Sequence, residues 1–384
     1  MWNKIKSIFK FDKGSTTLGF TQFSASIIAG IFTIFMAPIL GAENLGTIGY
    51  FFAVISIVTA LSSLGAPTIL LVYISKGVKL FSTISFLAIL STTISAIIVY
   101  FIFDEIILVI VIIAHIIFEL AINELLAKQL YVKHMKYFLS QRILFVTLSI
   151  PMFFLMGYVG FILMYGLSML PSIVRIYFGF KESKINFILI KERSHFLINN
   201  YLVSVSRTAY TFVDRLIILP IFGSAVLGNY ELAMQGIILA NVFAVFISSY
   251  LMPKDARKQP TYKIKIYSII GSIFISLFLI FMAPSVLSTL FPKFENAVTF
   301  IPIMALSIVP HILVILYTSK FFSLENSRII FISSVIHFIA LVSAILILTN
   351  YYSTMGLVVG FVIGEIVEAV FLMVMCKKYF KSFL

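Results

Sequence analysis

Twelve apolar runs, most of them about 20 residues long, set what this chain can fold into. A run of that length crosses the roughly 30 Å hydrocarbon core of a bilayer as one helix. The expected spans are 17–40, 45–66, 80–103, 106–126, 138–156, 159–180, 197–222, 226–251, 266–290, 298–319, 329–349 and 354–376. Only 11% of the residues are charged and 61% are hydrophobic, whereas soluble domains have about 25% charged residues. The sequence therefore predicts an all-α polytopic membrane protein with about twelve transmembrane helices.

The cationic residues are distributed unevenly between the two sides of such a protein. When the connecting segments are assigned to alternate sides, 25 of the 28 lysines and arginines fall on the side of the two termini. The opposite side holds only Lys293, and the remaining two, Arg207 and Arg215, lie inside the seventh span. Positive segments stay in the cytoplasm, so both termini are expected there. The net charge of +13 thus indicates topology rather than a nucleic-acid partner.

A short motif occurs twice at an offset of 182 residues, between the first and second helices of each half of the chain. The two copies are Pro38-Ile-Leu-Gly41-x-x-x-Leu45-Gly46 and Pro220-Ile-Phe-Gly223-x-x-x-Leu227-Gly228. We expect two six-helix bundles, 1–185 and 186–384, joined by a polar linker at 181–195 and related as parallel repeats. Two such bundles leave a cavity between them, and rocking can open it to either side in turn.

The seventh span carries a polar stripe. Asn200, Ser204, Arg207, Thr211 and Asp214 recur at spacings of four and three residues, which places them on one face of a helix. Arg207 falls near the bilayer midplane, where an ionisable side chain is costly and marks a functional candidate. The alternative interpretation is an Arg207–Asp214 pair that only satisfies both charges. We interpret the stripe as the wall of a substrate cavity.

Polar residues at helical spacing also occur in other spans. Gln22 and Ser26 of the first span correspond to the stripe of the seventh and are further cavity candidates. Candidates for gating or ion coupling are Arg215 with Glu231, which we expect to form an interhelical ion pair, His115 with Glu119 in the fourth span, and Glu365 with Glu368 in the twelfth. Two carboxylates one turn apart can hold H⁺ or Na⁺. No metal site and no cofactor are predicted.

Two segments resemble one family of transporters. They are Ile39-Leu40-Gly41-Ala42-Glu43-Asn44-Leu45-Gly46-Thr47-Ile48-Gly49-Tyr50-Phe51-Phe52-Ala53 and Asp214-Arg215-Leu216 followed by Gly223-Ser-Ala-Val-Leu227-Gly228-Asn229-Tyr230-Glu231-Leu232-Ala233. Both are similar to polysaccharide-transporter family proteins, the oligosaccharide-lipid (O-antigen-type) flippases. The superfamily of these proteins also contains multidrug and toxin extrusion exporters, so the resemblance implies that fold.

The resemblance implies a flippase that moves polyprenyl-pyrophosphate-linked oligosaccharides across the cytoplasmic membrane for surface polysaccharide synthesis. Its partners would be that glycolipid, membrane lipid and other polysaccharide assembly proteins. A guanidinium at position 207 suits a pyrophosphate, because its planar fork can donate two parallel hydrogen bonds.

Two other functions stay open. An ion-coupled exporter of drugs or small cations would have the same fold but a cavity dominated by carboxylates such as Glu119, Glu365 and Glu368. A membrane enzyme such as a polysaccharide polymerase would need a large polar loop on the outer side, and every outer loop here is short. No P-loop, dinucleotide fingerprint or H-E-x-x-H motif occurs, so we predict that the protein is not an enzyme.

Overall fold

The computed structural model describes residues 13–191, 194–256, 261–323 and 326–379, and all the regular elements in those ranges are helices. They are α2 (Lys13–Ser62), α3 (Ala66–Ser75), α4 (Phe81–Phe103), α5 (Ile106–Ala127), α6 (Tyr131–Leu167), the 3₁₀ turn η1 (Leu170–Ser172), α7 (Ile173–Glu182), α8 (Ile188–Lys191), α9 (Ser194–Ala256), α10 (Tyr262–Leu290), α11 (Glu295–Ala305), α12 (Ile308–Ser323), α13 (Ser327–Tyr352) and α14 (Thr354–Tyr379). The expected all-α fold is confirmed. The expected linker lies partly outside these ranges.

Three of the long helices are broken by a glycine. Gly41 in α2, Gly157 in α6 and Gly223 in α9 have φ angles of 73°, 62° and 82°, a region that L side chains rarely adopt. Eight helices of the described chain are long and apolar enough to cross a membrane, and α11 with α12 forms a bent ninth candidate. Counting each glycine-broken segment as two spans gives the expected twelve. The chain is thus built as a multi-pass membrane protein.

Three spans differ from the expected boundaries. The sixth is interrupted after Leu167 and continues through η1 as α7. The second ends at Ser62 and continues after a short turn as α3. The fifth begins at Tyr131 instead of 138, because its first two turns are polar on one side and hydropathy alone misses them. Arg142, one of the cations counted on the side of the termini, lies well inside this span.

The tenth span is bent by 44° between α11 and α12. Pro310 has no N–H to donate to the carbonyl of Leu306, four residues earlier, and its ring crowds that carbonyl. The break falls at Leu306 and Ser307. Next to it, the Ser276 hydroxyl of α10 donates to the carbonyl oxygen of Ala305 at 2.8 Å, which satisfies one backbone group at the bend.

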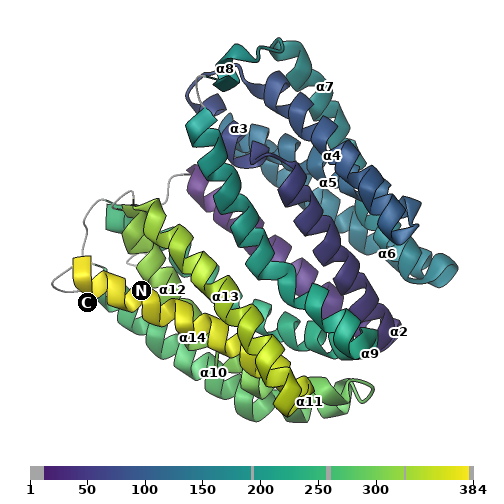
Figure 1. Cartoon of the computed structure of the whole chain (residues 1–384), viewed down its shortest axis with the longest axis vertical. Helices are drawn as coiled ribbons and strands as arrows, with labels where there is room; N and C mark the ends of the chain where they lie inside the picture. Colours follow the sequence, from purple (N-terminus) through teal and green to yellow (C-terminus); the bar gives the residue numbers. More distant parts are fainter. Residues whose placement is uncertain (1–12, 192–193, 257–260, 324–325, 380–384) are drawn as a thin grey trace.

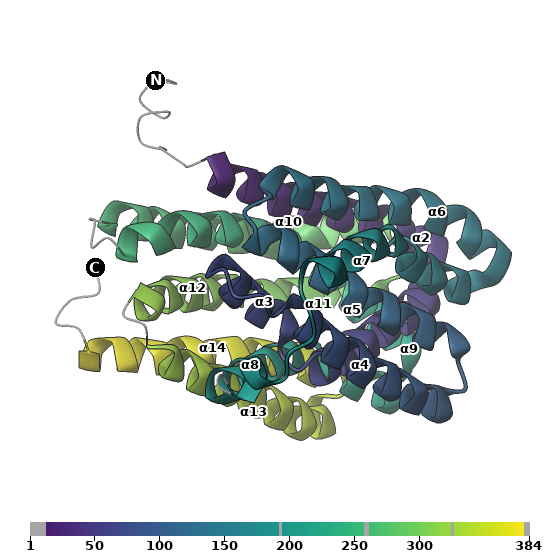
Figure 2. The same cartoon turned by 90° about the horizontal axis from the view of Figure 1, so that it is seen from above.

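The helices form two groups that converge at one end of the molecule (Figure 1). We call residues 13–182 (α2–α7) the N half and residues 194–379 (α9–α14) the C half. Helices α3 to α7 gather on one side of the picture and α10 to α14 on the other, with α2 and α9 between them. The first described turn of α2 and the last of α14 lie at the same end, on the left in Figure 2, as an even number of spans requires.

The two copies of the repeated motif pack directly against each other. A Cβ atom on Gly46 would overlap the carbonyl oxygen of Ser224, and a Cβ atom on Gly228 would overlap the carbonyl oxygen of Ala42. Ala42 and Ser224 are themselves 182 residues apart, so the contact is reciprocal. It lies where α2 and α9 bend, at the end away from the chain termini. The repeat therefore supplies the close backbone contact that joins the halves.

Candidate functional site

The predicted stripe of α9 lies mostly on an open face of the helix. Arg207 and Thr211 are exposed, and Asn200 and Ser204 are partly buried. We call these four residues the α9 polar face. Arg207 follows the first residue of α9 by thirteen residues, or about 20 Å at 1.5 Å per residue, and precedes the break at Gly223 by a similar length. It therefore lies near the middle of its span.

Contacts on either side of the α9 polar face show which way it points. On one side the Tyr201 hydroxyl donates to the carbonyl oxygen of Leu61 in α2 at 2.9 Å. On the other side the ring of Tyr210 lies 4.9 Å from the ring of His337 in α13. With 3.6 residues per turn, Arg207 projects from the arc between these two contacts. The arc faces the space between α2 of the N half and α13 of the C half.

The opposite side of the same helix is apolar. Ile198 and Leu202 are 57% and 47% exposed and project about half a turn away from Arg207. Apolar side chains exposed there suit lipid, whereas an Arg at that depth is stable only beside protein or water. The polar and the apolar side chains of α9 thus lie on opposite sides of the helix.

The first span likewise has a polar side and an apolar side. Gln22 is exposed and Ser26 partly buried on one side of α2, while Phe20, Ile31 and Phe35 are exposed on the opposite side. The polar side of α2 therefore faces protein or water as well, and the exposed phenylalanines and isoleucine suit lipid.

Asp214 differs from the expectation for a cavity residue. It is 2% exposed, and its carboxylate accepts hydrogen bonds from Arg215 Nη1 at 2.9 Å and from the Tyr230 hydroxyl at 2.5 Å. The alternative of an Arg207–Asp214 pair is therefore replaced by an Arg215–Asp214 pair. Because a charged carboxylate at this depth needs a cation beside it, Asp214 belongs to the structural core of the span.

The expected Arg215–Glu231 ion pair is present. Arg215 Nε donates to Glu231 Oε1 at 2.8 Å, and both side chains are buried. A Cβ atom on Gly49 of α2 would lie 2.7 Å from Glu231 Cγ, so the absence of a side chain at Gly49 makes room for this pair. The pair thus lies against the N half, close to the contact between the repeats.

The polar residues of the fourth span form a partly buried group inside the N half. His115 Nδ1 lies 3.3 Å from Thr59 Oγ1, and the Asn123 amide donates to Glu119 Oε2 at 3.3 Å. Arg142 is within electrostatic reach of both His115 and Glu119. Its Nε is buried and has no hydrogen-bond partner among the described residues. Arg142 was not among the candidate residues predicted from the sequence, because it was counted with the cations on the side of the termini.

The two glutamates of α14 do not pair with each other. Glu365 Oε2 lies 3.2 Å from His311 Nδ1 of α12, and Glu368 Oε2 lies 2.8 Å from His337 Nδ1 of α13. Neither His311 nor His337 was among the candidate residues predicted from the sequence. No signal in the sequence joins helices this far apart in the chain, so these partners were missed.

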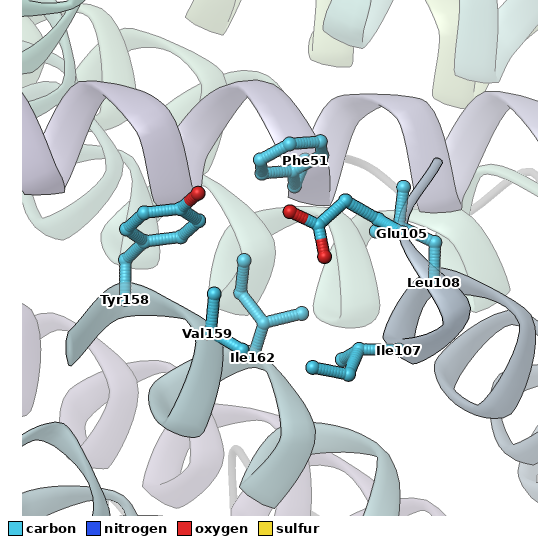
Figure 3. A pocket seen from close by; sticks show the side chains of 7 residues that line it. All are labelled: Phe51, Glu105, Ile107, Leu108, Tyr158, Val159 and Ile162. Carbon is cyan, nitrogen blue, oxygen red and sulfur yellow. The ribbon is translucent and has the colours of Figure 1, made fainter. Parts of the chain in front are cut away.

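Cavities near these groups are small. One of about 90 Å³ lies beside the contact between the halves and is lined mainly by α2 and α6, with Glu231 and Gln235 from α9. A pocket of about 10 Å³ lies at the start of α5. Figure 3 shows the Glu105 carboxylate in the space between Phe51 and Tyr158. The pocket has about the volume of one water molecule, so it is not a substrate site.

Solved structures with the same fold include transporters of the MOP superfamily and a lipid II flippase. A multidrug resistance MATE family transporter of the MOP superfamily, in an inward-facing conformation, superposes with a TM-score of 0.74 at 13% identity, covering 94% of this chain and 95% of that one. The lipid II flippase MurJ in an inward closed conformation gives 0.78 at 14%, covering 93% and 87%. A MOP superfamily transporter from Pyrococcus furiosus Vc1 gives 0.69 at 15%, covering 97% and 96%.

The sequence itself matches no protein-family model and no curated protein. The fold rests on the structural likeness, which extends over nearly the whole length of both chains. It also agrees with the twelve spans and the repeated motif. The chain therefore has the twelve-helix fold shared by the MOP superfamily transporters.

Proposed function

We propose that this chain is a flippase that moves polyprenyl-pyrophosphate-linked oligosaccharides across the cytoplasmic membrane by alternating access of its two halves. The observation that carries the proposal is the exposed guanidinium of Arg207, near the middle of a span, on a polar face between the halves. A guanidinium can bind a pyrophosphate through two parallel hydrogen bonds. The polar side chains on α9 and α2 can bind sugar hydroxyl groups.

The conformation suits the uptake of a substrate from the cytoplasmic leaflet. The halves converge at the end away from the termini, where the two glycines of the repeat meet. With both termini in the cytoplasm, as the charge distribution predicts, the converged end is the outer one. The similar flippase MurJ is named for lipid II, which supports a lipid-linked substrate.

An exporter of drugs or small organic cations is the second candidate, because a multidrug transporter has the same fold. Such a substrate needs an uncommitted carboxylate in the space between the halves. Glu119, Glu365 and Glu368 already have hydrogen-bonding partners, whereas Arg207 is exposed. This difference in charge favours an anionic substrate.

Translocation in reconstituted vesicles tests the proposal. The purified protein would be placed in vesicles that contain a fluorescent polyprenyl-pyrophosphate-linked oligosaccharide, and the fraction that reaches the other leaflet would be followed with time. Arg207→Ala should abolish translocation, and Arg207→Lys should restore it in part, since lysine keeps the charge without the planar fork. Arg328→Ala, at an exposed position at the start of α13, is the matched control and should behave as wild type. Unchanged translocation by Arg207→Ala would contradict the proposal.

A further inference from the structure

The C half contains two histidine–glutamate pairs at similar depth. His311 of α12 pairs with Glu365, and His337 of α13 pairs with Glu368. Glu365 and Glu368 lie one turn apart near the middle of α14. Two ionisable pairs inside a membrane domain are costly for structure alone, so a role in function is the default hypothesis.

The hydrogen-bonding partners of the two carboxylates suit the binding of a proton better than that of a metal ion. Each carboxylate is bonded to an imidazole nitrogen, and Glu368 also accepts a hydrogen bond from the Ser333 hydroxyl at 3.0 Å. Hard cations need several oxygen ligands. In the described chain, no three His, Cys, Asp or Glu side chains gather in a way that could hold a metal ion. Imidazole, in contrast, exchanges protons near neutral pH.

The two pairs differ in access to solvent. The side chain of His311 is 32% exposed, that of Glu365 is 11% exposed, and those of His337 and Glu368 are 3% and 8% exposed. The His311–Glu365 pair can therefore exchange protons with the solvent directly. The His337–Glu368 pair is enclosed.

Tyr210 connects the His337–Glu368 pair to the α9 polar face. Its ring packs on the ring of His337, and Arg207 precedes it by one helical turn. Tyr210 interacts electrostatically with Arg207, Glu365 and Glu368. Among the described residues, the ionisable groups gathered around the two pairs are therefore Arg207 and Tyr210 of α9 together with the four members of the pairs. Arg207 is the one permanent cation in this group.

We propose that the two histidine–glutamate pairs form a proton-binding site that is thermodynamically linked to anion binding at Arg207. This inference rests on the proposed function, since it takes the ligand of Arg207 to be a lipid pyrophosphate. Each pair is neutral when the imidazole is protonated and carries one negative charge after it releases that proton. Deprotonated pairs therefore repel an incoming pyrophosphate and attract the guanidinium that would bind it. By linkage, an anion bound at Arg207 promotes proton uptake by the pairs.

Calorimetry with farnesyl pyrophosphate tests the linkage directly. Binding to the full-length protein would be measured at pH 6 and pH 8, in two buffers with different ionisation enthalpies, so that the number of protons taken up is obtained. We expect wild type to bind about fivefold or more tightly at pH 6 than at pH 8, as a coupling of about 1 kcal/mol requires. We also expect net proton uptake and no effect of replacing Na⁺ with choline.

A pair of variants separates the contribution of the protein from the titration of the ligand itself. Glu365→Gln/Glu368→Gln should bind at pH 8 nearly as tightly as wild type does at pH 6, and should retain only the ligand's own proton uptake. Glu43→Gln, an exposed acid of α2, is the control and should retain the full wild-type proton uptake. Equal proton uptake by wild type and the double variant would overturn the linkage, and so would dependence of wild-type binding on Na⁺.

A second measurement needs only the wild-type protein. In protein with ¹⁵N-labelled histidine, farnesyl pyrophosphate should shift the imidazole signals of His311 and His337 toward the protonated form and leave that of His134, at the start of α6, unchanged. Unchanged signals of His311 and His337 with the ligand bound would overturn the inference while the proposed function stands. Absence of any binding of farnesyl pyrophosphate to wild type would instead contradict the proposed function, and the linkage with it.

Discussion

Gly46 and Gly228 approach each other's helices so closely that neither position has room for a side chain. The atoms that a Cβ would strike are the backbone oxygens of Ser224 and Ala42, which cannot rotate away. The same two glycines end the repeated motif in the sequence. The motif thus combines two functions: a glycine that breaks the helix and a glycine that lets the halves meet.

Gly46→Ala should therefore weaken the converged arrangement of the halves. Overpacking of this kind costs about 1–3 kcal/mol, which changes a two-state population about 5–150-fold. Spin labels at positions 43 and 225, in a Cys376→Ser background, would report the separation of the two helix bends, and we expect longer distances in the variant. Gly19→Ala is the control, because nothing lies within 4 Å of a Cβ there. An unchanged distance distribution in Gly46→Ala would show that the contact does not hold the halves together.

Arg215 should be sensitive to a change of shape as well as to loss of charge. It donates to Glu231, Asp214 and the carbonyl oxygen of Thr211, and only a guanidinium can serve all three at once. Arg215→Met leaves two buried carboxylates without their cation and should cost about 3–5 kcal/mol. Arg215→Lys should lie between this variant and wild type. The midpoint of thermal unfolding in detergent measures both, and equal midpoints for Arg215→Met and wild type would refute the structural role.

A second network, around the buried carboxylate of Glu124, stabilises the N half at the end of the chain termini. Glu124 accepts from Arg175 Nε at 2.6 Å and from Arg175 Nη2 at 2.7 Å, and Lys128 bridges Glu124 to Glu182. Glu124→Gln removes the charge that two cations share. It should lower the thermal midpoint well below that of Glu43→Gln, an exposed acid, since breaking a buried pair costs about 3–5 kcal/mol. Similar midpoints for the two variants would mean that the network is dispensable.

Much of the fold could be predicted because the features that determine it are local. A run of apolar residues is a span wherever it occurs, and Gly41 and Gly223 follow a proline by three residues at equivalent places in the chain. The start of the fifth span could not be placed in this way. The turns before Arg142 carry lysine and tyrosine, and they are helical because they extend a helix that the membrane already stabilises.

The candidate site was predictable along single helices and not between them. Helical spacing correctly placed Arg207 and Thr211 on one exposed face, and the short sequence separation of Arg215 and Glu231 made their pairing a natural expectation. The partners of Glu365 and Glu368 come from other helices, 54 and 31 residues away. Such pairs depend on how helices pack, which residue spacing does not encode.

Anion binding at Arg207 is tested by comparing how the purified protein binds farnesyl pyrophosphate and a monovalent organic cation. The comparison uses wild type, Arg207→Ala and Arg207→Lys. Wild type should prefer the pyrophosphate, Arg207→Ala should weaken its binding at least tenfold, and Arg207→Lys should fall between them. Loss of one charge-assisted bidentate contact costs about 1.5–3 kcal/mol or more, which corresponds to a loss of affinity of at least tenfold. Equal binding of the pyrophosphate by wild type and Arg207→Ala, or a preference of wild type for the cation, would contradict anion binding at Arg207.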